Sequence, residues 1–297
     1  MTARWYRGNL HTHTTNSDGD SAPDVVVSWY RDAGYDFLVV TDHDVLTDPN
    51  GLRDAAGPMT LIPGEEISSG DIHVNGLGIR ERIAPTMTDD IVTTIQGNVD
   101  AVRAQGGVPS INHPNFRWLV GPEHLAALRD VRLFEIHNAG PEVNNLGGRP
   151  GFPSVESTWD TLLSADHRML GVAVDDAHHF QVWGRLYSNP GRAWMMVRTE
   201  SADPASLLTA LDAGICYATT GVSLGELHAA GGELAIDIEQ QWENHYRTSF
   251  IGVDGRVLDV QEGLSVRYRM QDGDRYVRAR IDDSDGLTAW TQPLFRD

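Results

Sequence analysis

Apolar positions in the first two thirds of the chain form short continuous runs that alternate with amphipathic segments. The continuous runs, which are typical of buried strands, include 37–40, 61–62, 108–111, 133–136 and 169–174. Between them, apolar residues recur at helical spacing in 88–105, around 122–129 and near 157–165. An earlier helix begins at a capping-box-like Ser21-Ala22-Pro23-Asp24 and ends before Gly34. Strands that alternate with helices predict an α/β fold with parallel strands.

The pattern changes near residue 226. Segments 234–238, 264–269 and 276–281 alternate apolar and polar residues with period two, and Gly/Asp turns such as Asp254-Gly255 separate them. Such alternation is typical of antiparallel strands with one solvated face. We therefore predict two domains, an α/β domain over 1–225 and a small β-rich region over 226–297.

Charged and imidazole side chains follow the predicted strands. After the first strand, five more apolar runs lead into Thr41-Asp42-His43, Pro63-Gly64-Glu65-Glu66, Asn112-His113-Pro114, Glu135-Ile136-His137 and Asp175-Asp176-Ala177-His178. A barrel of parallel strands presents its active site on the loops at the C-terminal ends of its strands. The recurrence therefore predicts one polar site built from several strand ends.

His11 and His13 stand in the first of these clusters, Asn9-Leu-His-Thr-His-Thr14. If this segment is a strand, the two imidazoles point to the same side, about 7 Å apart, and can converge on one metal ion. Asp18 in the following loop adds an oxygen ligand. Mixed imidazole and carboxylate sites suit zinc, manganese or iron(II).

The overall charge narrows the choice of partners. The 297-residue chain carries 23 basic and 42 acidic residues, a formal charge of −19, and so repels long nucleic acids. One cysteine, Cys216, excludes an internal disulfide and a thiolate-rich zinc site. No stretch approaches the about 18 apolar residues of a membrane helix, and no apolar signal core precedes the first motif. We expect a cytoplasmic protein without a membrane partner; the sequence leaves its oligomeric state open.

Taken together and in order, these motifs resemble the polymerase and histidinol phosphatase (PHP) family over roughly residues 5–200. The opening Arg7-Gly-Asn-Leu-His-Thr-His13, Tyr217-Ala-Thr-Thr-Gly221 and the ending Ala289-Trp-Thr-Gln-Pro293 are similar to its carbaryl hydrolase (CehA-type) branch. The resemblance implies a distorted, TIM-like (β/α)7 barrel that holds two or three divalent metal ions.

The resemblance also implies a ligand set. The first metal would be held by His11, His13, Glu66 and Asp176, with Glu66 bridging to a second metal completed by His113 and His137. A third would be held by Asp18, His43 and His178. Close relatives often carry an aromatic residue where this chain has His137.

The expected activity is hydrolysis of a small phosphomonoester or diester by a metal-bound hydroxide, since a water bound between metals loses a proton near neutral pH. We assign His43, Glu66, Asp176 and His178 to the reaction and leave the proton donor open. Arg117, Arg185 and Arg192 follow candidate site loops and could clamp a phosphate, and His179 could reach the substrate.

Two other functions stay open. The same metal centre could hydrolyse a carboxyl or carbamate ester, and the chain could be a non-catalytic, metal-stabilised module. Several neighbouring residues are also ambiguous. We expect Glu65 to support the ligands or to face solvent, and Asp42 and Asp175 to orient ligands or cap loops. His73, on an alternating strand, could enter the cleft.

Overall fold

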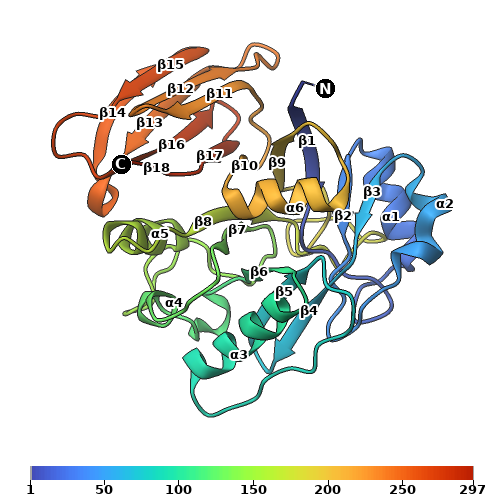
Figure 1. The fold of residues 1–297 in the computed structure, drawn as a ribbon. Coiled ribbons are helices and arrows are strands. Elements are labelled where there is room, and N and C mark those ends of the chain that lie inside the picture. The colour runs from blue at the N-terminus through green and yellow to red at the C-terminus, as the bar shows by residue number, and fades with distance from the viewer. Residues whose placement is uncertain (1, 297) are drawn as a thin grey trace.

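The structure, a computed structural model, describes residues 2–296 as a mixed α/β protein whose strands form three sheets (Figure 1). The largest sheet has ten strands. Along its path these are β14 (Val257–Glu262), β13 (Tyr246–Ile251), β16 (Tyr276–Asp283), β17 (Thr288–Thr291), β10 (Cys216–Thr219), β9 (Trp194–Thr199), β1 (Arg4–Asn9), β2 (Phe37–Val39) and β3 (Thr60–Ile62), with β18 (Leu294–Phe295) paired to β16.

The second sheet lies below the first in Figure 1 and carries most of the predicted strand ends. In order it contains β4 (Gly64–Ser69), β5 (Ile72–Leu77), β6 (Val108–Ile111), β7 (Leu133–Asn138) and β8 (Leu170–Val174). Strands β6, β7 and β8 are parallel, as are β1, β2 and β3, whereas β5 and β9 run antiparallel to their neighbours. The arrangement is therefore mixed rather than parallel throughout.

Short bridges join the two sheets at the strand ends. Thr12 pairs with Ala177 beyond β1 and β8, and His43 pairs with Glu66 beyond β2. The backbone N–H of Asp176 also donates to the carbonyl oxygen of His11 at 3.0 Å. The pairing describes two linked sheets, so the closed seven-stranded barrel stays a prediction.

Close approach of β1 and β2 depends on a glycine. A Cβ atom at Gly8 would lie 2.2 Å from the ring of Phe37, which is fully buried, so any side chain there would force the strands apart. Gly8 pairs with Phe37 in the parallel ladder. This tight pairing positions the two strands that lead to His11 and His43.

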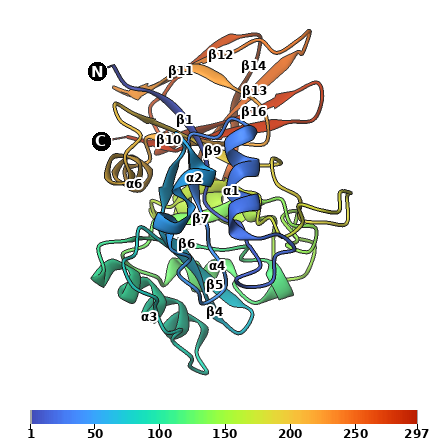
Figure 2. The same ribbon diagram turned by 90° about the vertical axis from the view of Figure 1, so that its right-hand side faces the viewer.

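Helices cover the sheets on their outer faces. They are α1 (Pro23–Asp32), α2 (Arg53–Ala56), α3 (Ile91–Ala104), α4 (Pro122–Ala126), α5 (Val155–Ser164) and α6 (Pro204–Ala213), with short 3₁₀ turns η1 (Pro49–Leu52), η2 (Phe116–Trp118) and η3 (Val253–Gly255). Helix α1 buries Val26, Val27 and Tyr30 in a core that also contains Leu38 of β2. It lies beside α2 in Figure 2. Its predicted capping box is not formed, because Ala22 is the N-cap and makes no side-chain cap.

The β-rich C-terminal part stacks a third sheet on the end of the largest one. Strands β11 (Leu224–Ala230), β12 (Glu233–Ile238) and β15 (Ser265–Arg269) form this antiparallel sheet, and they share a core with β13 and β16. Because β10 pairs with β17, the largest sheet crosses the predicted boundary after residue 225. That boundary stays a prediction.

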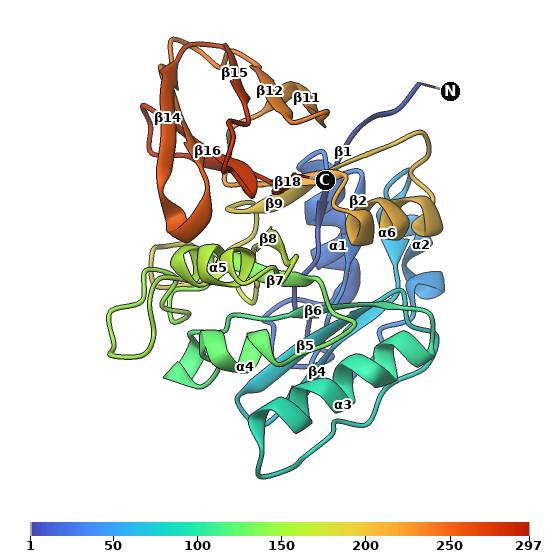
Figure 3. The same cartoon turned by 60° about the vertical axis from the view of Figure 1, so that its left-hand side comes forward.

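An ion pair fastens the C-terminal strands to α5, which lies beside them in Figure 3. The fully buried guanidinium of Arg278 donates from Nη2 to Asp160 Oδ2 at 2.6 Å and from Nη1 to Glu156 Oε1 at 3.0 Å. Within residues 2–296, no helix combines the length and the apolar character needed to cross a membrane.

Candidate metal centre

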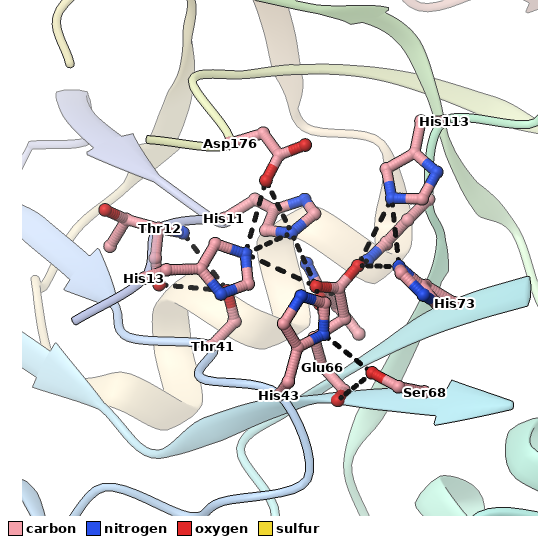
Figure 4. A network of polar contacts seen from close by, with 12 residues as sticks. His11, Thr12, His13, Thr41, His43, Glu66, Ser68, His73, His113 and Asp176 are labelled. Carbon is pink, nitrogen blue, oxygen red and sulfur yellow. Dashed lines mark hydrogen bonds and ion pairs between the residues drawn. The ribbon is translucent and has the colours of Figure 1, made fainter. Parts of the chain in front are cut away.

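Nine histidine, aspartate and glutamate side chains of the kinds that bind metal ions converge where the two sheets meet, and Figure 4 labels seven of them. They come from the segments after β1, β2, β6 and β8 and from strands β4 and β5. The nine are His11, His13, Asp18, His43, Glu66, His73, His113, Asp176 and His178. Eight of them are in the set that the sequence predicts, and His73 stands in the place expected for His137.

Glu66 lies at the centre of the group and is almost fully buried. The nitrogens nearest its Oε2 belong to His11 (3.2 Å), His13 (3.3 Å) and His43 (3.1 Å). Those nearest its Oε1 belong to His73 (2.9 Å) and His113 (3.3 Å). Each carboxylate oxygen therefore faces its own set of imidazoles, which is the geometry needed to share one carboxylate between two ions.

Three of the imidazoles are oriented by an acceptor on their outer side. These acceptors are Glu135 Oε1 for His11 Nδ1 (2.7 Å), the Gly70 carbonyl oxygen for His73 Nε2 (2.9 Å) and the Asp176 carbonyl oxygen for His178 Nδ1 (2.9 Å). Donating the outer N–H leaves the inner nitrogen of a neutral ring with a lone pair that faces the centre. Metal-ligating histidines are held in this way.

The inner atoms repel one another unless positive charge lies between them. His11 Nε2 is 3.1 Å from His13 Nε2 and 3.2 Å from Asp176 Oδ1. Burial lowers the pKa of His11, but the charges of Asp176 and Glu66 outweigh it and raise that pKa well above its usual value. Burial lowers the pKa of His13 to about 4. A divalent cation would supply the same positive charge and release the proton.

A second group lies nearer to solvent. His178 Nε2 is 3.3 Å from Asp18 Oδ1, and His43 Nε2 is 3.6 Å from Asp18 Oδ2. Burial raises the pKa of Asp18, but the hydrogen bond from His178 and its charge outweigh burial and hold the pKa far below the usual value. Together with His13 these residues form a four-residue cluster with ligand atoms within 4.8 Å of one another.

Two members of the centre have left-handed backbone conformations. His113 has φ 20° and Asp176 has φ 49°. Non-glycine residues seldom adopt such angles, which cost roughly 1–3 kcal/mol and persist where the surroundings impose them. The turns after β6 and β8 thus place His113 toward Glu66, and Asp176 toward His11 and His13, at the expense of local strain.

A buried polar network supports the ligands. Glu135 accepts from the backbone N–H of His113 at 2.7 Å and from Asn138 Nδ2 at 2.8 Å. Asn138 also donates to Asp176 Oδ2 at 3.0 Å, and Asn112 donates to Glu66 Oε1 at 2.7 Å. These contacts fix the carboxylates before any ion binds.

Two neighbouring carboxylates, Asp42 and Asp175, cap loops, as we expect from the sequence. Asp42 accepts from the Thr14 backbone at 2.7 Å and from Thr47 Oγ1 at 2.6 Å. Asp175 accepts from three backbone N–H groups between residues 191 and 193, and burial raises its pKa to about 6. Glu65 points away from Glu66 and accepts from the Ile83 N–H; burial raises its pKa to about 7.

His137 does not join the centre. A bulge between Glu135 and His137 in the β7–β8 ladder interrupts the alternation of sides, so Glu135 faces the ligands while His137 turns away. Its ring stacks on Trp290 of β17, with centroids 5.6 Å apart. It lines a different cavity from Glu66.

The four residues predicted to contact the substrate lie in different places. His179 lines the cavity at the centre, with its Nδ1 buried and without a partner among residues 2–296. Arg117 is exposed, with its guanidinium 5.2 Å from the Phe116 ring centre. Arg185 and Arg192 line the cavity that contains His137. None of the three arginines lines the cavity at Glu66.

His73 and Glu135 are the contributors that the sequence motifs leave uncertain or omit. His73 and Asn75 occupy alternate positions of β5, and both point to the centre, where Asn75 accepts from Asn112 at 2.9 Å. That alternation is visible in Asp71-Ile-His-Val-Asn75. Glu135 stands within the motif Glu135-Ile136-His137, but its support of His11 depends on the bulge that follows it.

The cavity at the centre has a volume of about 340 Å³. Candidate ligands line part of it, and the apolar residues Phe116, Pro141, Val143 and Leu186 also line it. Of the lining residues beyond the ligands, Glu142 and His179 are the titratable ones. The cavity is therefore of a size for a small organic molecule held against a row of nitrogen and oxygen ligands.

Comparison with known proteins identifies the fold. No protein-family model matches the chain, and no curated protein matches it. Among solved structures, one similar to it is a two-domain protein from Bacteroides vulgatus with a predicted PHP-like metal-dependent phosphoesterase, at a TM-score of 0.53 and 17% identity. The match covers 94% of this chain and 90% of that one. The two chains share a fold. At this identity the likeness extends to the fold alone.

Two further structures resemble part of the chain. A proposed metal-dependent phosphoesterase from Bifidobacterium adolescentis matches with a TM-score of 0.44 and 16% identity, covering 61% of this chain and 89% of that one. An amidohydrolase from Chromobacterium violaceum matches with a TM-score of 0.43 and 16% identity, covering 59% and 88%.

Proposed function

We propose that the protein is a metal-dependent hydrolase of the PHP type, and that it acts as a phosphoesterase on a small phosphomonoester or diester. The observation that carries this proposal is a set of imidazoles whose outer nitrogens donate to fixed acceptors. The inner nitrogens of His11 and His73 face Glu66, and that of His178 faces Asp18. We also propose that the chain forms a distorted barrel, that it belongs to the CehA-type branch, and that it binds two or three ions.

The donor set fits divalent ions. His11, His13, Glu66 and Asp176 would hold one ion, and Glu66, His73 and His113 a second. Asp18, His43 and His178 would hold a third. Such ions, when bound, activate water as a nucleophile and offset the charge that develops on the ester oxygens.

The chain's own residues position and protect the reaction. Glu66 and Asp176 keep the inner nitrogens in place, and Asn112 and Asn138 fix the two carboxylates. The apolar wall formed by Phe116, Pro141 and Val143 limits access of bulk water. His179 lines the cavity outside the ligand clusters, and we assign it the delivery of a proton to the leaving oxygen.

A carboxyl or carbamate ester is the second candidate substrate. The specific observation in its favour is that no arginine lines the cavity at Glu66, and the chain has no lysine. A neutral ester needs no cationic side chain beside the metal ligands, so the cavity wall suits it as well.

The proposal is tested with metal-supplemented protein against panels of phosphomonoesters, phosphodiesters, and carboxyl and carbamate esters. We expect turnover that chelation abolishes and metal restores. Glu66→Gln should lose at least about a hundredfold in kcat/KM, about 2.7 kcal/mol in barrier, because two ions lose a shared anionic ligand. Glu65→Gln is the matched control and should keep its activity, since Glu65 points away.

Two outcomes would contradict the proposal. Retained metal without hydrolysis of any ester would favour the non-catalytic, metal-stabilised module. Loss of activity in Cys216→Ser with metal content and fold intact would indicate covalent chemistry; we expect no loss, because Cys216 is buried and burial raises its pKa to about 12.

A further inference from the structure

A second cavity lies beside the metal centre and contains residues that the proposed reaction does not use. It has a volume of about 760 Å³ and is formed by the segment after β7, the start of α5, the 185–192 loop and strands β16 and β17. The cavity therefore lies where the C-terminal strands meet the α/β part of the molecule.

The second cavity is adjacent to the cavity at Glu66. Gly140 lines both of them, and the consecutive residues Arg185 and Leu186 line one each. Asn138 lines the second cavity while its amide nitrogen donates to Asp176 in the centre at 3.0 Å. A molecule of moderate length could therefore occupy both cavities.

Charge is distributed unequally between the two cavities. Arg185, Arg192 and Arg280 line the second cavity with Glu156 as the acidic lining residue, in a chain whose formal charge is −19. In the cavity at Glu66 no arginine is among the lining residues. Of these two cavities, the second is therefore the one whose described lining includes arginines.

The three arginines differ in how far they are already paired. Arg280 donates to Glu156 at 2.9 Å and to Asp282 at 3.0 Å, and Arg192 holds its own loop through Tyr187 at 2.8 Å. Arg185 has no hydrogen bond or ion pair with any residue that the structure describes, and it is exposed at the cavity. Its five N–H groups remain available to a ligand.

Other lining groups also lack partners. The indole N–H of Trp290, a residue only 6% exposed, has no acceptor within residues 2–296. The His137 ring stacks on Trp290, and no described residue forms a hydrogen bond with its nitrogens. The unpartnered N–H groups of Arg185 and Trp290 suit a ligand group rich in acceptor oxygens.

We propose that the second cavity binds a carboxylate or phosphate group at the far end of the substrate while the ester to be cleaved lies at Glu66. This inference rests on the proposed function and adds a substrate class to it, namely small esters that carry a second anionic group. Arg185 would make the principal contact.

The test uses non-hydrolysable ω-phosphonoalkanoic acids, with about three to ten methylene groups to span the two cavities, and their carboxyl methyl esters. Binding to the metal-loaded full chain is measured by isothermal titration calorimetry. Over a limited range of chain lengths, each acid should bind at least about tenfold more tightly than its methyl ester, because the linked carboxylate gains a charge-assisted contact. Inorganic phosphate serves as the probe of the metal centre alone.

Charge reversal locates the contact. Arg185→Glu should abolish the advantage of the acids and leave the affinity for the methyl esters and for phosphate unchanged. Arg256→Glu is the matched control, since Arg256 is exposed in the C-terminal part and lines neither cavity. Arg256→Glu should still bind each acid more tightly than its methyl ester.

The other outcomes overturn the inference. Phosphate binding without an advantage of the acids at any length, or an advantage that survives Arg185→Glu, would reject the second cavity as a subsite. Acetate that binds there as tightly as the linked carboxylate would indicate a site for free anions instead. If phosphate itself does not bind to the metal-loaded protein, the proposed function fails as well.

Discussion

Two histidines, His73 and His137, distinguish the proposed centre from the ligand set that the motifs imply. His73 Nδ1 lies 2.9 Å from Glu66, while His137 stacks on Trp290 in the neighbouring cavity. Their spacing in the sequence does not reveal this exchange. The sides to which they point depend on the ladder of β5 and on the bulge in β7.

Single substitutions test whether His73, and not His137, is a metal ligand. Removing an oriented imidazole deletes a metal ligand, so His73→Ala should lower bound metal by about one ion per chain or weaken its affinity by at least about tenfold. His137→Ala should keep the full metal content. Elemental analysis after dialysis against a metal buffer measures both. Metal loss in His137→Ala but not in His73→Ala would contradict the assignment.

His137 also makes the stability depend on pH. Burial, the largest cause, lowers its pKa to about 4 in the folded protein, below the ordinary 6.5. Between these values the unfolded chain binds a proton that the folded chain does not, so stability falls as pH decreases from 6.5 to 4.

The substitution His137→Phe removes this titration and can keep the ring stack. The free energy of unfolding of the variant, relative to wild type, should therefore rise as pH decreases from 6.5 to 4. Urea titrations at several pH values measure the difference. His228→Phe, at an exposed position of β11, should show no such trend; equal slopes for His137→Phe and wild type would show that His137 is not buried as described.

At the scale of elements, the loop after β1 is held by one buried carboxylate. Asp42 accepts hydrogen bonds from Thr14, Ser17 and Thr47. Since Ser17 precedes Asp18 directly, this cap determines where Asp18 lies relative to His43 and His178. The sequence indicates such a role for Asp42, because a ligating histidine follows it, but not its partners.

Asp42→Ala should loosen the outer ligand group and leave the inner one in place. We expect affinity for the most weakly held ion to fall by about 10–100-fold, while the metals at Glu66 remain. Metal titration with a chromophoric chelator measures the change. Asp48→Ala, which removes the cap of η1 nearby, is the control and should leave all affinities unchanged. Equal loss of every ion in Asp42→Ala would show a general effect on folding.

At the scale of the whole molecule, the C-terminal strands are bound to α5 by a buried ion pair. Arg278 is 0% exposed and its guanidinium contacts Asp160 through two hydrogen bonds, at 2.7 and 2.6 Å. Without the Asp160 charge, the buried guanidinium would keep Glu156 as its anionic partner, at 3.0 Å, and would lose its two shorter contacts. Part of a buried charge would then be uncompensated.

Asp160→Asn should therefore lower the free energy of unfolding by about 3–5 kcal/mol. The double substitution Arg278→Met with Asp160→Leu should lower the free energy of unfolding by less than the sum of the effects of Arg278→Met alone and Asp160→Leu alone. The reason is that the double variant leaves neither partner unpaired. Urea unfolding measures each. Glu226→Gln is the control, since Glu226 forms a solvent-accessible ion pair with Arg198. It should lower the free energy of unfolding by less than about 1 kcal/mol. Additive single effects would mean that the two side chains act independently.

The sequence alone determined the alternating strands and helices and the short motifs around His11, His43, Glu66, His113 and Asp176. Such features depend on residue type and on neighbours a few positions apart, so periodicity and motif order reveal them. It also indicated period-two strands after residue 226, which β12 (Glu233–Ile238) and β15 (Ser265–Arg269) confirm by their alternating burial. The third predicted segment forms β16 (Tyr276–Asp283), which is buried along most of its length.

Only the tertiary structure decided which faces and partners these elements use. One extra residue in β7 turned His137 from the centre to a second cavity, since side chains in a strand alternate with period two. Pairing of Ala218 with Trp290 joined the C-terminal strands to the largest sheet. Contacts between residues so far apart in the chain depend on packing of the whole molecule, and no local pattern encodes them.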